Sequence, residues 1–373
     1  MDHYDVIVLG GGTMGSGAAW ALGKRGVRAL VLEQFQHVHA FGSHSGKIRI
    51  IRHAYAESPE YVPLVLQADA LWCALEEETG RQVLHRTGGL DLAAPGFEQA
   101  RRALGSAQQF GLPHEWLGGQ EIRHRWPAWR IDDGWEACYS PDSGFLLTEP
   151  ALASLMTAAQ RRGVILHDRE PAREWHADGA GIRVRTDRAT YTADRLIVTA
   201  GAWASQALAS LGLPLTVLRK VVWWLEVEDP TAFAIGRFPI YIAQSDLGSI
   251  YGFPLFGSDA LRLANHTGGE PTSPDAVDRA VHAPEIDEVL PFARRQLRGV
   301  TERVAVSAVC LYTVTPDENF VVDRHPESPG VVLGAGFSGH GFKFATAIGD
   351  MLATLALDPA ARPLPRFAVG RFL

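Results

Sequence analysis

The sequence predicts an α/β (α+β) protein of two domains, one built from strand–helix–strand units and the other an inserted, largely antiparallel β-sheet. Three observations predict this class. The N-terminal region has a strand, a glycine loop and a helix in succession, and the C-terminal region returns to that pattern. Between residues 218 and 314, apolar residues alternate over long segments. The 373 residues, 46% of them apolar, are enough for two hydrophobic cores.

The first strand–helix–strand unit occupies residues 4–33. An apolar run at 5–9 is followed by a glycine loop at 10–15, a helix pattern at 16–25 and a second apolar run at 28–32. Because a helix connects the two strands, we expect them to be parallel, as in a Rossmann-like unit.

Two further helices are expected. One is predicted over 63–78 and stopped by Gly80, and the other over 150–162, with Thr148 at its start and Gly163 after its end. Short apolar runs predict strands at 164–166, 182–185, 195–198 and 331–333. A last helix is expected to end near residue 357.

The change of pattern along the chain suggests how it divides between the domains. We expect residues 1–83, 143–217 and 318–373 to form the Rossmann-like domain. Residues 84–142 and 218–317 are then expected to form the substrate domain, with its largely antiparallel β-sheet.

Composition and charge narrow the class of partner. Lys and Arg total 35 against 42 Asp and Glu, so the net charge is -7, and no basic block suggests nucleic acid or an anionic membrane surface. No uncharged apolar stretch reaches the roughly 18 residues of a membrane span. The first apolar run is too short for a signal peptide core, so we expect a cytoplasmic protein with a small-molecule partner.

The three cysteines give no metal-site pattern. Cys73, Cys138 and Cys310 are far apart, without a C-x-x-C pair or histidines at zinc spacing. We therefore expect no metal and reduced thiols.

The glycine loop predicts a dinucleotide site. Its residues after the first strand are Gly10, Gly11, Gly12, Thr13, Met14 and Gly15, which match G-x-G-x-x-G. Glycines allow a pyrophosphate to approach the backbone, and the helix N-terminus favours its charge. Glu33 ends the second strand at about 20 residues' distance, where an acid accepts a hydrogen bond from a ribose. The motif by itself leaves FAD and NAD open.

Four segments carry a more specific resemblance. They read FGSHSGKIRIIRHAY at 41–55, ADRLIVTAGAW at 193–203, AVCLYT at 308–313 and GFSGHGFKF at 336–344. The segments at 41–55, 308–313 and 336–344 resemble the monomeric sarcosine oxidase and N-methyltryptophan oxidase family, and the segment at 193–203 resembles the second flavin-contacting strand of the wider D-amino-acid-oxidase group. The resemblance implies FAD as cofactor, a small amino acid oxidised to an imine, oxygen converted to hydrogen peroxide, and a monomer. It also implies cofactor contacts at Ser43, Arg49, Ala200, Gly201, Trp203, Gly339, Gly341 and Lys343.

Cys310 matches the family cysteine that carries the flavin as an 8α-thioether. The alternation of Val304, Val306, Ala308, Cys310 and Tyr312 along a strand places the last two on one face, so that one face would hold both the tether and a substrate wall. Outside this context, a buried structural cysteine is the ordinary alternative.

Arg52 and Lys343 match the family residues that hold the substrate carboxylate. A guanidinium fork and an ammonium suit an amino-acid carboxylate, and Lys343 lies where a helix dipole opposes a cation. The alternative is that both are solvated surface charges. Arg49 resembles a residue beside the flavin and, in a regular strand, faces away from Arg52.

The substrate wall is expected from the inserted domain. Tyr251 and Tyr312 match family tyrosines, Ile242 is expected to limit the size of the pocket, and His266 matches the family histidine near the amine. His266 is one of 14 histidines, so an incidental position is the alternative.

Arg262 departs from the family pattern, because it stands at the oxygen-activating lysine. Ser45, Lys47 and Ile48 also replace a histidine, an acid and a threonine usual in the sarcosine enzymes. A guanidinium keeps the positive charge but is broader and less hydrated than an ammonium. This leaves as alternatives a flavin amine dehydrogenase with another acceptor and an oxidase for a cyclic imino acid such as proline or pipecolate. A flavin-binding protein without turnover and an NAD-dependent dehydrogenase explain fewer of these residues.

Overall fold

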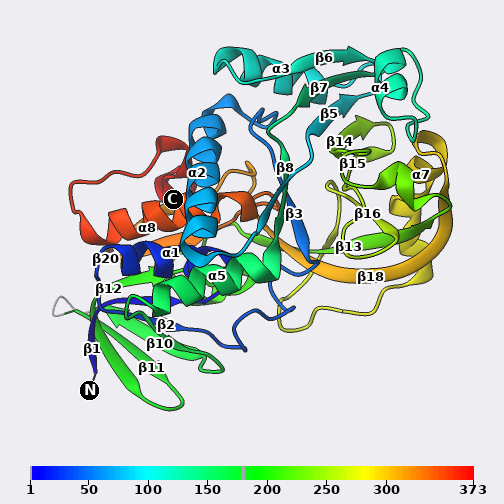
Figure 1. The fold of residues 1–373 in the computed structure, drawn as a ribbon. Coiled ribbons are helices and arrows are strands. Elements are labelled where there is room, and N and C mark those ends of the chain that lie inside the picture. The colour runs from blue at the N-terminus through cyan, green and yellow to red at the C-terminus, as the bar shows by residue number, and fades with distance from the viewer. Residues whose placement is uncertain (1, 178–180) are drawn as a thin grey trace.

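The strands of the described residues form three sheets, of eight, nine and three strands. The computed structural model describes residues 2–177 and 181–373. Figure 1 shows the eight-stranded sheet with its helices on one side of the molecule and the nine-stranded sheet on the other. Within the described part of the chain, no helix has the length and apolar character needed to cross a membrane. The expected mixture of an α/β domain and a largely antiparallel domain is confirmed.

The eight-stranded sheet has a parallel centre in the order β9, β2, β1, β12 and β20. These strands are β1 (His3–Leu9), β2 (Ala29–Leu32), β9 (Ile165–His167), β12 (Thr190–Val198) and β20 (Ser328–Ala335). The antiparallel additions are β10 (Ala172–Ala177), β11 (Ile182–Thr186) and β19 (Val321–His325). The central strands carry apolar side chains on both faces, because other parts of the chain pack against each face of the sheet.

The helices α1 (Thr13–Lys24) and α8 (Ala345–Leu357) lie on one face of this sheet, and α2 (Val62–Thr79) and α5 (Thr148–Gln160) pack against them. Val6, Val8 and Val31 point toward them, whereas Ile7 and Leu30 point to the opposite face, which the β10–β11 hairpin covers. The strand period of two distributes neighbouring residues between the two cores.

Helix ends were only partly predicted. α2 agrees with the expected 63–78 and ends at Gly80, whose φ of 68° is left-handed. α5 begins at Thr148 instead of Pro150, and its capping residue is Leu147, without a side-chain bond. The prediction that Thr148 caps this helix is therefore wrong; a proline in the first turn leaves the helix intact because no intrahelical partner is lost there.

The nine-stranded sheet is antiparallel except where β5 pairs with β14. It contains β5 (Gly89–Ala93), β6 (Glu115–Gly118), β7 (Glu136–Ser140), β13 (Thr216–Val227), β14 (Ile240–Ser245), β15 (Gly248–Gly252), β16 (Ala260–Asn265), β17 (Glu270–Pro271) and β18 (Val300–Val314). The helices α3 (Gln99–Gln109), α4 (Gly119–Arg125) and α7 (Leu290–Gln296) belong to the same region. Leu90, Leu92, Leu261 and Leu263 face its core, and the alternate residues face the first domain.

A small antiparallel sheet lies between the two larger ones (Figure 1). It is formed by β3 (Ile48–Ile51), β8 (Gly144–Leu147) and β4 (Leu84–Arg86). The remaining short helix is α6 (Ala204–Ala207), and 3₁₀ turns include Pro59–Tyr61, Gly201–Trp203 and Phe342–Phe344. The strands divide between the sheets much as the expected domain ranges do, but those ranges stay a prediction.

α1 and α8 approach closely because glycines face each other at their crossing. A Cβ at Gly17 would lie 2.1 Å from the carbonyl oxygen of Ala345, and one at Gly349 would lie 2.2 Å from the carbonyl carbon of Gly17. Both distances are shorter than any real contact, so backbone meets backbone at this crossing. The arrangement fixes α8, and with it the loop that precedes α8, against the glycine loop that precedes α1.

We predict that Gly17→Ala destabilises the protein. The added methyl overlaps backbone that no side-chain rotation relieves, at a cost of about 1–3 kcal/mol, which outweighs the gain of up to about 1 kcal/mol from helix propensity. The midpoint of urea unfolding, followed by circular dichroism, should fall. Gly105→Ala in α3 is the matched control, because its Cβ meets nothing within 4 Å, and its midpoint should stay or rise. A Gly17→Ala protein as stable as the Gly105→Ala protein contradicts the packing argument.

Candidate active site

A cavity of about 570 Å³ opens at the carboxyl ends of β1, β2 and β12. Ligands of open parallel sheets bind at this edge. Residues expected to contact the cofactor or substrate that line it are Gly10, Gly12, Thr13, Met14, Glu33, Ser43, Arg49, Ala200, Gly201, Trp203, Tyr312, Gly339 and Gly341. The other expected residues, which are not part of the lining, are Gly15, Arg52, Tyr251, Arg262, His266, Cys310 and Lys343.

Each of the three glycines in the G-x-G-x-x-G loop is required for a different physical reason. Gly10 has a φ of +94°, and a Cβ there would lie 2.5 Å from the carbonyl oxygen of Thr199. Gly15 is a packing residue, since its Cβ would lie 1.7 Å from the carbonyl oxygen of Gly10. At Gly12 a Cβ would meet nothing within 4 Å, and the residue borders the cavity. Gly12 therefore leaves space beside the N-terminus of α1, where a phosphate is favoured.

Glu33 directly follows β2 at the edge of the same cavity. Its Oε2 accepts a hydrogen bond from Gly11 N, and its Oε1 accepts one from Phe35 N, both at 2.8 Å. Burial raises the pKa of this carboxyl, although the backbone amides oppose the shift. Each oxygen keeps a lone pair, so the side chain is able to accept a further hydrogen bond from a sugar hydroxyl.

Cys310 lies outside the lining but contacts Arg49, which borders the cavity. Arg49 Nη2 donates to the carbonyl oxygen of Ser43 at 2.9 Å and lies 3.7 Å from Cys310 Sγ. The Ser45 hydroxyl donates to the same sulfur at 3.1 Å. Cys310 pairs with Lys220 and Tyr312 with Leu218 across β13 and β18, so Cys310 and Tyr312 share one face, as the alternation predicts.

Arg262 is fully buried within this end of the site. Its Nη1 donates to the carbonyl oxygen of Ile48 at 2.7 Å, and its guanidinium lies 4.5 Å from the ring centre of Phe253 and 5.4 Å from that of Trp224. Nε and Nη2 find no hydrogen-bond partner among the described residues. Burial lowers the pKa of Arg262 to about 10, so the group remains a cation at neutral pH.

Arg52 lies in a buried ionic cluster on the opposite side of β3 from Arg49. Its Nη2 donates to both oxygens of Glu57 at 2.6 Å, and Nη1 lies 3.5 Å from Asp91 Oδ1. Desolvation acts to raise the pKa of Glu57, but Arg52 lowers it to about 2, and the Glu57 side chain keeps 35% of its surface exposed. For Asp91 burial prevails and raises the pKa to about 6. Arg52 is 2% exposed, which excludes the solvated alternative.

Lys343 joins this cluster from the 3₁₀ turn that precedes α8. Its ammonium donates to the carbonyl oxygen of His340 at 3.0 Å and to the hydroxyl of Tyr55 at 3.4 Å. Tyr55 is joined in turn to His340 Nδ1 at 2.6 Å. Burial, followed by the charge of Arg52, lowers the pKa of Lys343 to about 7. Lys343 is 6% exposed and is not a surface charge.

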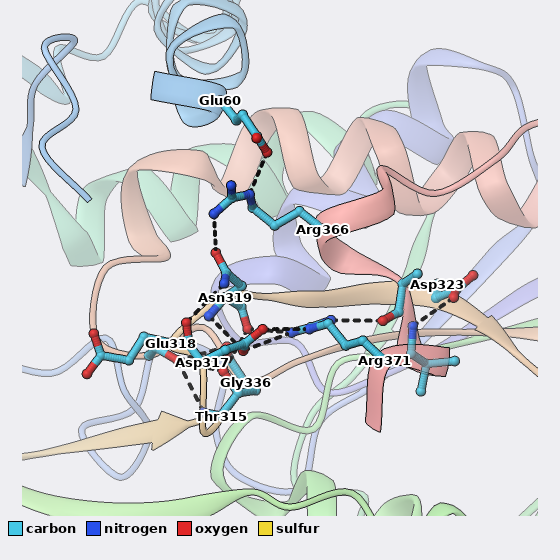
Figure 2. A network of polar contacts seen from close by, with 12 residues as sticks. Glu60, Thr315, Asp317, Glu318, Asn319, Asp323, Gly336, Arg366 and Arg371 are labelled. Carbon is cyan, nitrogen blue, oxygen red and sulfur yellow. Dashed lines mark hydrogen bonds and ion pairs between the residues drawn. The ribbon is translucent and has the colours of Figure 1, made fainter. Parts of the chain in front are cut away.

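Figure 2 shows the C-terminal segment bonded through Arg366 and Arg371 to the turn of Asp317 and Asn319. Arg371 Nε donates to Asp317 at 2.9 Å, and Arg366 Nη1 donates to Asn319 Oδ1 at 3.2 Å. His340 Nε2 lies 3.1 Å from the carbonyl oxygen of Glu318, within the same turn. This network couples the last residues of the chain to the loop at 336–341 that borders the cavity.

The expected substrate wall lies on the face of the nine-stranded sheet that meets this cluster. Tyr251 pairs with Ile242 and with Ala264 across neighbouring strands, so the three share one face. His266 Nδ1 lies 3.4 Å from the hydroxyl of Tyr312. Burial lowers the pKa of His266 to about 4, so its ring is neutral at pH 7.

Four residues of the cluster were not singled out from the sequence: Tyr55, Glu57, Asp91 and His340. For Glu57 and Asp91 the sequence contained a feature that could have identified them. Glu57 follows Arg52 by five residues, and Asp91 is the one charged residue of an otherwise apolar strand, Gly89–Ala93. An acid at a strand position where both neighbours are core leucines has to be paired or neutral.

The residues of the cavity fit FAD. Gly12 and the N-terminus of α1 form an anion cradle, Glu33 offers a sugar acceptor, and the cavity continues from there to Arg49 and Tyr312. A long lining of this kind suits a dinucleotide with an attached ring system.

Comparisons with known proteins agree with this fit. Residues 5–355 match the FAD dependent oxidoreductase family. The chain is 39% identical over 370 residues to a monomeric sarcosine oxidase from Streptomyces avermitilis, covering 98% of this chain and 96% of that protein. It is 36% identical over 373 residues to N-methyl-L-tryptophan oxidase from Yersinia pestis, covering 99% of each. Among solved structures, it superposes on NikD, an unusual amino acid oxidase, with a TM-score of 0.86 at 27% identity, over 99% of this chain and 98% of that one. This protein therefore belongs to the FAD dependent oxidoreductase family.

Proposed function

We propose that the protein oxidises the C–N bond of a small N-methyl or secondary amino acid to an imine, and that reoxidation by oxygen yields hydrogen peroxide. The observation that carries the proposal is the buried pair of cations, Arg52 and Lys343, beside a wall of Tyr251, Tyr312 and neutral His266. FAD, when bound, takes up the electrons removed from the amine and passes them to oxygen.

The chain's own residues bind and orient the amino acid in this proposal. Lys343 supplies an ammonium and Arg52 a guanidinium whose buried Nε has no partner among the described residues, so both have donors for a carboxylate. An amine is oxidised only when its nitrogen lone pair is free. Because the ring of His266 is neutral at pH 7, it does not oppose an incoming ammonium and is able to accept a hydrogen bond from it.

Oxygen is the proposed acceptor, with Arg262 as the group that assists it. Oxygen becomes negatively charged when it takes up its first electron, and a fixed cation in a dry site stabilises that charge. Arg262 has two unpartnered donors within the described structure and keeps its proton at pH 7. Because it replaces a lysine of the resembled family, a dehydrogenase that uses another acceptor is the second candidate function.

Three finer features belong to the same proposal. We propose that Cys310 carries the flavin as an 8α-thioether, since its sulfur lies 3.7 Å from Arg49, which borders the cavity. We propose a monomer, as the name of the sarcosine relatives states of them. The three free cysteines suit a cytoplasmic location.

Anaerobic mixing with candidate amines tests the function. Sarcosine, N-methyl-L-tryptophan, L-proline and L-pipecolate should be compared by bleaching of the flavin absorbance, with dimethylamine as a control that lacks a carboxylate. We expect bleaching by at least one amino acid and none by dimethylamine. Lys343→Met should need at least about 30-fold more of the best substrate, from the roughly 2–5 kcal/mol of a lost buried partner. Failure of every amine to bleach the flavin contradicts the function.

The tether is tested separately from turnover. Protein precipitated with acid should stay yellow, and Cys310→Ala should release its flavin on precipitation or fail to retain it. Cys73→Ser, a partly buried cysteine of α2, is the matched control and should stay yellow. A colourless pellet from the unmodified protein excludes the covalent bond but leaves FAD binding intact.

The role of Arg262 is tested by separating the two half-reactions in a stopped-flow instrument. Arg262→Met should slow reoxidation by oxygen at least about tenfold, as expected for one lost electrostatic donor. Reduction by substrate should be nearly unchanged, and Arg262→Lys should restore or exceed the original reoxidation rate. If Arg262→Met reacts with oxygen as fast as the unmodified protein, Arg262 does not assist the reaction with oxygen. Fast dye reduction with little oxygen uptake by the unmodified protein favours the dehydrogenase.

A further inference from the structure

The cluster around Arg52 contains one acid more than a carboxylate clamp requires. Glu57 holds the guanidinium with both oxygens at 2.6 Å, whereas Asp91 Oδ1 remains at 3.5 Å. Asp91 is 3% exposed and lies in β5, whose five residues are all buried. An ionised carboxylate in such a place is costly unless it is closely paired. Asp91 is therefore the less compensated of the two acids.

Asp91 faces the proposed substrate wall and not the core. Leu90 and Leu92 point into the hydrophobic core of the sheet, so Asp91 between them points to the other face. On that face its neighbour across the strands is Ile242, which in turn pairs with Tyr251. Gln99 Nε2 donates to Asp91 Oδ1 at 2.7 Å and holds the carboxylate toward Arg52.

The charges around Asp91 balance before any substrate binds. The titratable groups that face it are Arg52, Tyr55 and Glu57 from the segment after β3, Lys343 from the turn before α8, and Cys138 from the adjacent β7. Among these groups, Arg52 and Lys343 carry two positive charges, and Glu57 and Asp91 carry two negative charges when ionised. A substrate carboxylate adds a third negative charge, and the described residues of this cluster include no further cation to match it.

We propose that Asp91 takes up a proton when a substrate carboxylate binds to Arg52 and Lys343, which makes Asp91 a positioning residue for an anionic substrate. This inference rests on the proposed function. The incoming carboxylate replaces the charge of Asp91 beside Arg52, and Glu57 keeps its two bonds. For an amino acid, the amine loses one proton and Asp91 gains one, so binding exchanges no net proton with solvent. A carboxylate without a basic nitrogen draws that proton from the buffer.

The pH range follows from the two groups that titrate. Burial raises the pKa of Asp91 to about 6 in the free protein, and an added anion raises it further. Proton uptake by Asp91 therefore disappears below about pH 6, where the group is already protonated, and is present above it. Lys343, with a pKa lowered to about 7, adds uptake of its own at higher pH. The contribution of Asp91 is most distinct at about pH 6.5.

Methoxyacetate is a suitable probe because it has the shape of sarcosine, with an ether oxygen in place of the amine. Binding to the holoenzyme is measured by calorimetry at pH 6.5 in two buffers of different ionisation enthalpy. The unmodified protein should take up about 0.7–1 proton per ligand, and Asp91→Asn about 0–0.3. Asp246→Asn, a surface acid paired with Arg295, is the control and should match the unmodified protein.

Equal proton uptake in the unmodified and Asp91→Asn proteins overturns the proposal, as does failure of both to bind methoxyacetate. If Asp91→Asn does not fold, infrared difference spectra of the unmodified protein replace it. Methoxyacetate should then produce the C=O band of a protonated carboxyl, and its absence overturns the proposal. If uptake depends on Asp91 but no amine bleaches the flavin, the proposed oxidation fails and the role of Asp91 stands. If an amine bleaches the flavin but the unmodified and Asp91→Asn proteins take up equal numbers of protons, the proposed oxidation stands and the role of Asp91 fails.

Discussion

The cost of burying charge between two sheets is the constraint on which this site depends. Arg52, Asp91, Arg262 and Lys343 are each at most 6% exposed, and they lie where the nine-stranded sheet meets the strand β3 and the turn before α8. A buried ion is tolerated only where partners replace its water. Ionic and polar contacts as well as apolar packing consequently join the two domains, because Arg52 lies 3.5 Å from Asp91 of β5 and Lys343 donates to Tyr55.

The sequence predicted correctly those features that depend only on residues close together in the chain. The glycine loop, its helix and Glu33 lie within one strand–helix–strand unit, and the structure places the loop and Glu33 at one cavity. The alternation around Cys310 predicted a shared face with Tyr312 because strand geometry alone decides it. The Thr148 cap failed because α5 begins directly after β8 ends at Leu147, which makes Thr148 the first helical residue and Leu147 the capping residue.

The sequence indicated only part of the ionic cluster, because the contact between Arg52 and Asp91 forms only in the tertiary structure. Arg52 and Glu57 are five residues apart, but Asp91 reaches Arg52 only after β5 joins the inserted sheet. Nothing in a strand pattern says which distant charge an acid will meet. The same holds for Arg262, whose position in the sequence indicated its importance but not its two aromatic neighbours or its unpartnered nitrogens.

The two groups of buried cations differ in their electrical balance, and this difference suggests a division of work. Arg52 is matched by Glu57 and Asp91, so its surroundings suit a substrate that brings a permanent charge and has to displace one already present. Arg49 and Arg262 form no ion pair with any described residue, and apart from the 3.7 Å contact of Arg49 with Cys310 Sγ their hydrogen bonds go to backbone carbonyls. Carbonyl dipoles compensate a cation less than a carboxylate does. Positive potential is thus left beside Cys310, as the proposed stabilisation of negative charge that appears only during the reaction requires.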